Sequence, residues 1–374
     1  MRHPGLIFCI TLLGLGMHAN GFSQSTQAIK ENDLIPVPQD FRPIENAAFV
    51  LQAPLKIVPE SSTVDPHATA VTELVAALDK FKSLKLRVTP ARKIPTKAIF
   101  LAQSTAPAAK KWLQQNGLAF TAQMQAEGYV LQISKQGVVV IGGSSRGLFY
   151  GVMTLIQVIE QAKQPRLPGM QVRDWPALRF RGVSDDISRG QVSTLAHFKK
   201  IVRFLAKYKM NTYMLYLEDM FRFKKYPQIG QGRGALTAEE TKELQAFAKN
   251  YFVEIIPIFQ TLGHYENILN QPEFMHLAEF PGAASLSPAK PAVYDFLQDL
   301  IDEIAPVFES PYFHMGADES WDVGKGASRA LVERYDIATV HARHYQKVAA
   351  MLRKHHKKVL MYGDIILQHP TILN

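Results

Sequence analysis

The chain has 374 residues, of which 47% are apolar and 20% are charged, and this composition excludes an intrinsically disordered protein. The net charge of +9 is spread along the chain, and the densest basic run, residues 353–358, ends a predicted helix without interleaved aromatic residues, so no nucleic-acid partner is expected. The length allows two domains, one of them large.

Residues 1–24 are predicted to be a secretory signal peptide. Arg2 and His3 precede an apolar core at residues 6–16, and small residues follow at 19–23. The core is too short to span a bilayer as a helix, although an uncleaved anchor or a buried helix is the alternative. We therefore expect a secreted or periplasmic protein with no integral membrane span. The only cysteine, Cys9, lies in this segment, so the mature protein is expected to have no disulfide.

Residues 35–170 are predicted to form a small α+β domain. Strand-type runs occur at 49–52, 55–58, 86–88, 98–103, 128–134 and 137–143, and amphipathic helices at 68–81 and 145–161. Two residues, Lys135 and Gln136, separate the last two strands, which predicts a hairpin. The glycine-rich run at 142–147 lacks the Lys-Ser/Thr ending of a phosphate loop and is expected to cap a helix. A Pro-rich joint at 164–169 is expected to end the domain.

From residue 178 to residue 374, apolar strands alternate with amphipathic helices. The strands are predicted at 180–188, 211–219, 253–260, 312–316 and 358–364, with helices at 193–208, 237–251 and 291–304. Thr237 and Glu240 form a capping box, and Pro291 opens the last of these helices. This alternation predicts a parallel sheet with covered faces, which is either a (β/α)8 TIM-type barrel or a doubly wound open sheet.

Polar residues follow nearly every predicted strand, and this favours the barrel. They are Asp186, Arg189, Glu218, Asp219, His264, Glu266, Asp318, Glu319 and Asp364. In a (β/α)8 barrel all the carboxyl ends of the strands meet at one rim, where active sites are built. Asp318 and Glu319 are the strongest signal, because adjacent carboxylates repel unless one is protonated or employed chemically. A solvated loop or a helix start is the alternative for this pair.

Four motifs resemble those of the family 20 glycoside hydrolases, the β-N-acetylhexosaminidases. HMGADE at 314–319 resembles the family's His-x-Gly-Gly/Ala-Asp-Glu, and RGVSDDISR at 181–189 matches the Arg-Gly-x-x-x-Asp-x-x-Arg of its first barrel strand. YKMNTYMLYLED at 208–219 resembles the second-strand motif, and FQTLGH at 259–264 corresponds to the third-strand segment that ends Gly-His. The second-strand motif departs from many members, with Tyr216 in place of a histidine. The resemblance implies an α+β domain before a (β/α)8 barrel.

By this resemblance, Glu319 protonates the glycosidic oxygen and later activates water. Asp318 holds the sugar's 2-acetamido group, whose carbonyl oxygen is the nucleophile, and Asp219 and His264 support the acid through a relay. Arg189 is implied to bind hydroxyls of the terminal sugar. The implied protein is an exo-acting β-N-acetylhexosaminidase that acts on terminal β-linked GlcNAc or GalNAc, and its partner is an amino-sugar oligosaccharide. An inactive carbohydrate-binding remnant of such an enzyme is the alternative.

The resemblance implies no organic cofactor and no metal. A zinc site made by His264, His314 and the acids is the alternative, but the ligand spacing is poor. A related substrate-assisted chitinase or O-GlcNAc hydrolase is disfavoured, because its acids are placed differently. Residues 180–374 carry about five βα units and fall short of the roughly 250 residues of an eight-stranded barrel. The sequence therefore predicts an incomplete barrel, truncated within the catalytic domain.

Overall fold

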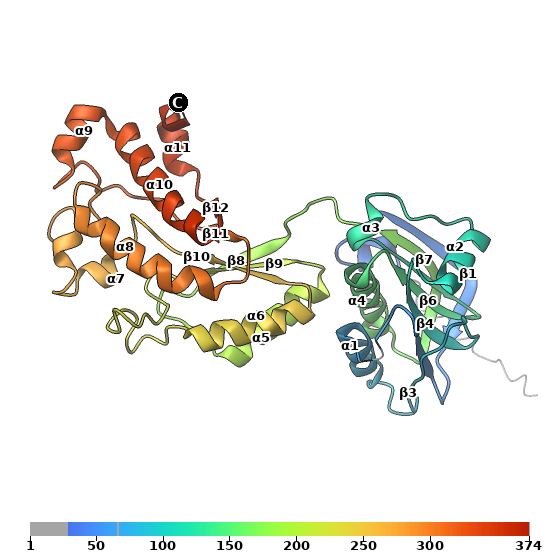
Figure 1. The fold of residues 1–374 in the computed structure, drawn as a ribbon. Helices are drawn as coiled ribbons and strands as arrows, with labels where there is room; N and C mark the ends of the chain where they lie inside the picture. Colours follow the sequence, from blue (N-terminus) through green and yellow to red (C-terminus); the bar gives the residue numbers. More distant parts are fainter. Residues whose placement is uncertain (1–28, 66, 374) are drawn as a thin grey trace, which may run out of the picture.

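The computed structural model describes residues 29–65 and 67–373, so the predicted signal peptide lies outside the described residues. The described chain is built on two sheets, one of seven strands and one of five, which lie in separate parts of the molecule (Figure 1). No helix in this part of the chain has the length and the apolar character that a membrane crossing requires.

The first sheet mixes parallel and antiparallel neighbours in the order β1-β7-β5-β6-β4-β2-β3. Its strands are β1 (Asp40–Val50), β2 (Lys56–Pro59), β3 (Arg87–Val88), β4 (Ala98–Gln103), β5 (Tyr129–Ser134), β6 (Gly137–Gly142) and β7 (Arg166–Asp174), and its helices are η1 (Glu31–Asp33), α1 (Thr69–Leu78), α2 (Pro107–Gln115), α3 (Met124–Glu127) and α4 (Ser145–Gln161). On β4, Ile99 and Leu101 belong to the apolar cluster that contains α1 and α4, whereas Phe100 belongs to the cluster that contains α2 and α3. Because alternate residues of a strand point to opposite faces, this apolar run is buried on both sides.

The hairpin and the helix predicted in this domain are confirmed. β5 and β6 pair antiparallel across the expected turn, and α4 has the predicted bounds. The glycine-rich run before α4 is a helix cap, since Ser144 Oγ accepts the backbone N–H groups of Arg146 at 3.1 Å and Gly147 at 3.3 Å. Only glycine fits at position 142, because a Cβ there would lie 2.0 Å from a backbone nitrogen of α4.

The prediction of a Pro-rich joint at 164–169 is wrong. This segment enters β7, which pairs with β1 on one side and with β5 on the other, so the first sheet continues to Asp174. Pro168 stands opposite Ala48, directly beside the register shift in β1. A proline is tolerated in a strand where the hydrogen-bond ladder is interrupted, which is why proline content misled the sequence interpretation. The helices α2 and α3 were also not predicted.

The second sheet is parallel, and its strands follow one another in chain order from β8 to β12. They are β8 (Gly182–Asp186), β9 (Thr212–Tyr216), β10 (Glu254–Ile258), β11 (Tyr312–His314) and β12 (Lys358–Leu360). The helices of this domain are α5 (Leu195–Lys207), α6 (Ala238–Asn250), α7 (Glu266–Leu269), η2 (Met275–Leu277), α8 (Pro291–Ile304), η3 (Ala305–Val307), α9 (Arg329–Tyr335), α10 (Ile337–Lys354), α11 (Asp364–Gln368) and η4 (Pro370–Leu373). In a doubly wound sheet the order in which successive strands are added reverses at a switch point. The unbroken order therefore confirms the (β/α)8-type barrel over the open sheet, with five βα units in the described chain.

The three helices of the second domain that the sequence predicts with bounds, α5, α6 and α8, begin at or within two residues of the expected positions. Thr237 Oγ1 accepts the N–H of Glu240 at 3.1 Å, and the Glu240 carboxylate accepts the N–H of Thr237 at 3.0 Å, which completes the capping box of α6. Pro291 occupies the first turn of α8, and Thr194 caps α5. These helices return the chain to the start of each next strand, so the strand ends share one rim.

Candidate active site at the rim of the second sheet

Asp318 and Glu319 lie on the loop that follows β11. The loop turns sharply, with left-handed backbone at Gly316 (φ +67°), Ala317 (φ +74°) and Glu319 (φ +45°). A Cβ at Gly316 would lie 2.1 Å from the side-chain oxygen of Gln260, so glycine is required there. The turn leaves the Asp318 side chain 21% exposed and the Glu319 side chain 58% exposed.

His264 stands between the two acids. Its Nε2 lies 3.6 Å from Asp318 Oδ2 and 3.5 Å from Glu319 Oε2. The contact with Asp318 raises the pKa of His264 despite the opposing effect of burial. Contacts of this length are longer than hydrogen bonds, and catalytic contacts often shorten when substrate binds.

Gln260 holds Asp318 from the other side. Its Nε2 donates to Asp318 Oδ1 at 2.7 Å and to Tyr216 Oη at 2.9 Å, and its Oε1 accepts the backbone N–H of Ala317 at 3.2 Å. Burial raises the pKa of Asp318, but the contacts with His264 and Gln260 outweigh burial, so the net pKa of Asp318 is lowered. Asp318 is therefore an oriented, ionised carboxylate. The role of Gln260 was missed from the sequence, although it lies within the segment 259–264.

The structure does not bring Asp219 to this group, and the expectation that it would join His264 is wrong. The buried Asp219 carboxylate lies 3.3 Å from Arg233 Nε and accepts from Asn267 Nδ2 at 3.3 Å. Its neighbour Glu218 faces the site instead, with Oε1 3.8 Å from His264 Nδ1.

Glu218 links the histidine to the arginine. Its Oε1 accepts from Tyr216 Oη at 3.0 Å and lies 2.8 Å from Arg189 Nη2. The Glu218 side chain is only 1% exposed, and burial raises its pKa against the opposing effect of Arg189. Arg189 is half-exposed and also contacts Asp186 Oδ2 at 3.2 Å. Arg189 therefore reaches the acids through Glu218 and His264.

Left-handed backbone recurs at the ends of three neighbouring strands. Glu218 after β9 has φ +43°, His264 after β10 has φ +58°, and Glu319 after β11 has φ +45°. Residues other than glycine seldom adopt this conformation, and where they do the surrounding contacts must impose it. His264 and the two acidic residues Glu218 and Glu319 that approach it therefore all have a backbone conformation that the surrounding contacts must support.

The remaining strand-end residues support the loops. Asp364 Oδ2 accepts the backbone N–H of Glu319 at 3.1 Å. Burial lowers the pKa of His314 to about 4, its ring centroid lies 4.4 Å from that of Tyr362, and its Nδ1 accepts the backbone N–H of Gly316 at 3.1 Å, so His314 is a neutral residue that supports the loop. Within residues 29–65 and 67–373, no three His, Cys, Asp or Glu side chains are grouped to hold a metal ion.

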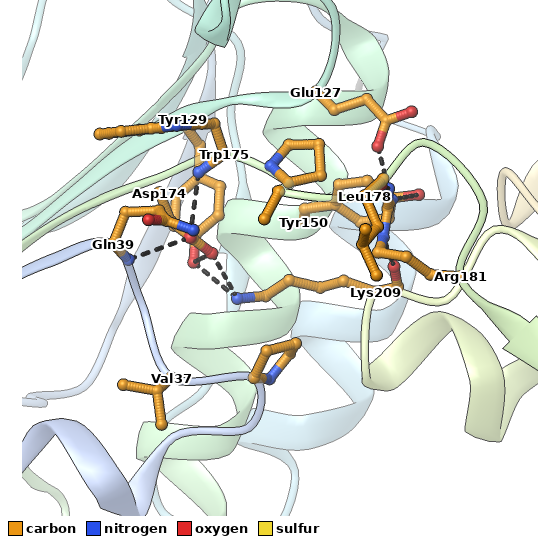
Figure 2. Close-up of a pocket in the computed structure, with 13 residues that line it drawn as sticks. Val37, Gln39, Glu127, Tyr129, Tyr150, Asp174, Trp175, Leu178, Arg181 and Lys209 are labelled. Atoms are coloured by element: carbon orange, nitrogen blue, oxygen red, sulfur yellow. Dashed lines mark hydrogen bonds and ion pairs between the residues drawn. The ribbon is translucent and has the colours of Figure 1, made fainter.

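A cavity of about 190 Å³ lies elsewhere, at the junction of the two domains (Figure 2). Lys209 Nζ lies 2.9 Å from Asp174 Oδ2 and 2.8 Å from Tyr129 Oη, and Tyr129 Oη donates to the same carboxylate oxygen at 2.9 Å. Arg181 Nη2 pairs with Glu127 Oε2 at 2.5 Å. These charges are paired with one another across the junction, so this region joins the domains and is separate from the acids.

Comparison with known protein families matches nearly the whole described chain. Residues 31–175 match the model of glycosyl hydrolase family 20, domain 2, and residues 178–374 match the model of the glycosyl hydrolase family 20 catalytic domain.

Two of the curated relatives that this chain resembles are named β-hexosaminidase. The β-hexosaminidase of Porphyromonas gingivalis is 29% identical over 294 residues, which cover 67% of this chain and 37% of that protein. The β-hexosaminidase subunit A2 of Dictyostelium discoideum is 32% identical over 195 residues, which cover 48% of this chain and 35% of that protein. The chain thus spans less than half the length of these relatives.

Solved structures share the fold. The chitobiase of Flavobacterium johnsoniae superposes with a TM-score of 0.72 at 21% identity, covering 91% of this chain and 54% of that one. The β-N-acetylhexosaminidase of Bacteroides fragilis gives a TM-score of 0.67 at 19% identity, covering 89% of this chain and 67% of that one. Since the catalytic-domain model alone matches more than half of the residues, the chain belongs to glycosyl hydrolase family 20.

Proposed function

We propose that this protein is an exo-acting β-N-acetylhexosaminidase that removes terminal β-linked GlcNAc or GalNAc by a substrate-assisted, retaining mechanism. The observation that carries the proposal is the pair of acids at one strand end, with His264 3.5 to 3.6 Å from both carboxylates. The curated relatives named hexosaminidase support the same substrate class. The partner is an amino-sugar oligosaccharide.

Asp318 has the properties that the first step requires. The carbonyl oxygen of the substrate's 2-acetamido group attacks C1, the glycosidic bond breaks, and an oxazolinium ion forms. Asp318, whose pKa is lowered and whose Oδ1 is fixed by Gln260, accepts the acetamido N–H and stabilises the positive charge. Its orientation precedes substrate binding, so little reorganisation accompanies the reaction.

Glu319 transfers the protons. As the bond to the leaving group breaks, its carboxylic acid donates a proton to the glycosidic oxygen, and the resulting carboxylate then deprotonates the water that opens the oxazolinium ion at C1. Two displacements at C1 retain the configuration. The negative charge that develops on Glu319 lies 3.5 Å from His264 Nε2, whose raised pKa favours the positively charged ring. Glu218, on the far side of the ring, favours the same charge.

Arg189 is placed to orient the sugar. Its half-exposed guanidinium is anchored by Glu218 and Asp186 and presents a planar fork of donors toward the rim. Such a fork suits neighbouring hydroxyl groups.

The test is hydrolysis of an aryl β-N-acetylglucosaminide by the purified chain, with Glu319→Gln in parallel. Release of the aryl group that is lost in Glu319→Gln is the expected result. An aryl β-glucoside, which lacks the acetamido group, should not be cleaved. Folded protein that releases no more aryl group than the variant would overturn the proposal. Binding of N-acetylglucosamine-thiazoline without turnover would identify the carbohydrate-binding alternative.

We also propose that the protein acts outside the cytoplasm, on the basis of the predicted signal peptide at residues 1–24. Mass spectrometry of the protein's N-terminus, after secretion or extraction from the periplasm, tests this. A new N-terminus near residue 25 is expected, and an intact N-terminus in the cytoplasmic fraction would contradict it.

A further inference from the structure

Three buried polar side chains lie on one face of α10, behind the acids. They are His341, His344 and Tyr345, and their spacing of three and four residues places them on the same side of the helix. Burying such groups costs free energy unless each is hydrogen-bonded. We call these three side chains the α10 clamp.

The α10 clamp contacts the loop that carries the acids at two points. Ser320 Oγ lies 3.0 Å from His341 Nε2, and Tyr345 Oη donates to the backbone carbonyl of Ala317 at 3.3 Å. Ala317 and Ser320 directly flank the two acids. The clamp therefore holds both ends of the four-residue segment whose middle residues are proposed to react.

The third member of the α10 clamp contacts the other loop of the site. His344 Nε2 lies 2.9 Å from the backbone carbonyl of Thr261, three residues before His264. Thr261 Oγ1 in turn donates to the carbonyl of Met315 at 2.8 Å, at the start of the acid loop. One helix face thus binds the acid loop and the His264 loop, and a direct bond joins the two loops.

The hydrogen-bond partners fix the tautomer of each histidine. The carbonyl of Ile337 lies 2.9 Å from His341 Nδ1 and can only accept, so Nδ1 carries the proton and Nε2 accepts from Ser320. His344 Nε2 faces a carbonyl and must donate.

Both histidines are neutral, so the α10 clamp acts by position and not by charge. Burial lowers the pKa of His341, with Ile337, His369 and Asp364 as the other groups that act on it. Burial lowers the pKa of His344 to about 3, with Thr261, His341 and Lys347 as the other influences.

The backbone on both loops requires such support. Ala317 and Glu319 on one loop and His264 on the other have positive φ. A left-handed conformation at residues other than glycine persists only where the surroundings over-determine it. The contacts of the α10 clamp fall within these same segments.

We propose that the α10 clamp is a positioning device that sets the distance between His264 and the acids Asp318 and Glu319. Its members touch neither substrate nor the reacting atoms. The inference rests on the proposed function only where activity is the readout, since the distance itself is a property of the folded chain.

The first experiment measures that distance through the ionisation of His264. Histidine labelled with ¹³C at Cε1 is titrated by NMR in the full chain, and the His264→Gln spectrum assigns the signal. The contact with Asp318 raises the pKa of His264, and Glu218, Glu266 and, at 3.5 Å, Glu319 are the other ionisable groups that face it. Ser320→Ala, Tyr345→Phe and their combination should lower this pKa toward its ordinary value, because a looser acid loop moves Asp318 away.

A matched control is available in the same domain. Tyr294 Oη donates to the carbonyl of Pro288 at 3.2 Å, and its ring packs against that of His344. Tyr294→Phe removes a similar hydroxyl-to-carbonyl bond and keeps the ring. This bond involves neither the acid loop nor the His264 loop. The control should leave the pKa of His264 unchanged. An unchanged value in the folded Ser320→Ala/Tyr345→Phe variant as well would overturn the proposal.

The second experiment separates positioning from folding. His344→Gln keeps a side-chain N–H donor, whereas His344→Leu removes it. Displacing a catalytic group by about 1 Å costs on the order of 100-fold in rate. We expect kcat to fall about 10- to 100-fold in His344→Leu and in the Ser320→Ala/Tyr345→Phe variant, with KM within about twofold, and His344→Gln to recover most of the loss. Assays are run well below the Tm of every variant.

The two experiments also distinguish the two proposals. A parent chain without activity refutes the proposed function, and the NMR titration still decides on the α10 clamp. An active parent whose clamp variants keep both kcat and the pKa of His264 refutes the clamp and leaves the function standing. If His344→Leu does not fold, the two isosteric substitutions at 320 and 345 still decide.

Discussion

The buried ion pair at the domain junction gives a prediction of stability that can be worked from the structure. Lys209 and Asp174 have side chains only 6% and 10% exposed, and Lys209 Nζ lies 2.9 Å from Asp174 Oδ2 (Figure 2). Burial lowers the pKa of Lys209 even though Asp174 opposes that effect. Desolvation of the ammonium group and the nearby positive charge of Arg181 together outweigh the effect of Asp174 on this pKa.

Removing only the lysine charge should destabilise the protein, because the carboxylate would stay buried. Breaking a buried pair from one side typically costs about 3–5 kcal/mol. In Lys209→Met, Asp174 would keep three donors, namely Tyr129 Oη at 2.9 Å, Trp175 N at 3.0 Å and Gln39 N at 3.2 Å. These hydrogen bonds place the expected loss at the lower end, about 3 kcal/mol, or roughly 6–12 °C in Tm for a domain of this size.

The double variant supplies the decisive comparison. Lys209→Met/Asp174→Asn removes both charges and keeps an oxygen that can accept from Tyr129. Because replacing both members of a buried ion pair by neutral groups is often neutral or stabilising, the double variant should regain at least half of the loss seen in Lys209→Met. Thermal unfolding by calorimetry and circular dichroism measures all four proteins of the cycle. A Lys209→Met protein within about 0.5 kcal/mol of the parent, or a double variant that equals the sum of the single losses, would refute this reasoning.

Three further predictions concern the rim. Glu218→Gln should lower both kcat and the NMR-measured pKa of His264. Asp219→Asn should lower Tm and leave the pKa of His264 unchanged. The opposite pattern would support the sequence-based assignment of Asp219, in place of Glu218, as the acid that acts with His264. Because its pKa is raised, His264 contributes stability at pH values below its ordinary pKa, and this stability is lost as pH rises through its pKa in the folded protein. Because its pKa is lowered, Asp318 contributes stability at pH values above its ordinary pKa, and this stability is lost as pH falls through its pKa in the folded protein. The Tm difference between the parent and His264→Gln should therefore be largest between about pH 4 and 6.5 and shrink on either side, and a flat difference would contradict the pair. Gly316→Ala should lower Tm and kcat together, because φ is +67° there and the added Cβ would lie 2.1 Å from a buried amide oxygen; calorimetry and the aryl-glycoside assay check it, and an unchanged kcat would show that the loop tolerates the shift.

The second domain could be predicted well because its signals are local and repeated. Each amphipathic helix has its own start signal, such as the capping box at Thr237 and Glu240, and each apolar strand is followed by polar residues. Parallel order and a shared rim follow from the alternation itself. The first domain was harder. Its β1 and β7 are far apart in sequence, and Pro168 within β7 stands beside a register shift in β1 that interrupts the hydrogen-bond ladder. That compensation lies in the partner strand.

The site was predictable as a place but not in every contact. The sequence places the adjacent acids and His264 at one rim because strand ends in a barrel converge there, and the structure brings these three side chains together. Gln260 was missed because an amide carries no charge signal, and its value lies in donating to Asp318 while accepting from the backbone of Ala317. The α10 clamp was missed because a helical stripe of histidine and tyrosine is read as core packing until its hydrogen-bond partners are known.

The sequence assigns Asp219 to the site, whereas the structure places Glu218 beside His264. This difference shows where strand periodicity stops predicting the direction of a side chain. Side chains alternate between faces only while the backbone stays extended, and β9 ends at Tyr216. Two residues later Glu218 adopts φ +43°, so extrapolating the strand cannot tell which of the adjacent acids turns toward His264. The same break occurs at His264 and at Glu319. The residues that converge on the site are thus those at which local sequence rules fail, because their backbone conformation is imposed by contacts with other strands and with α10.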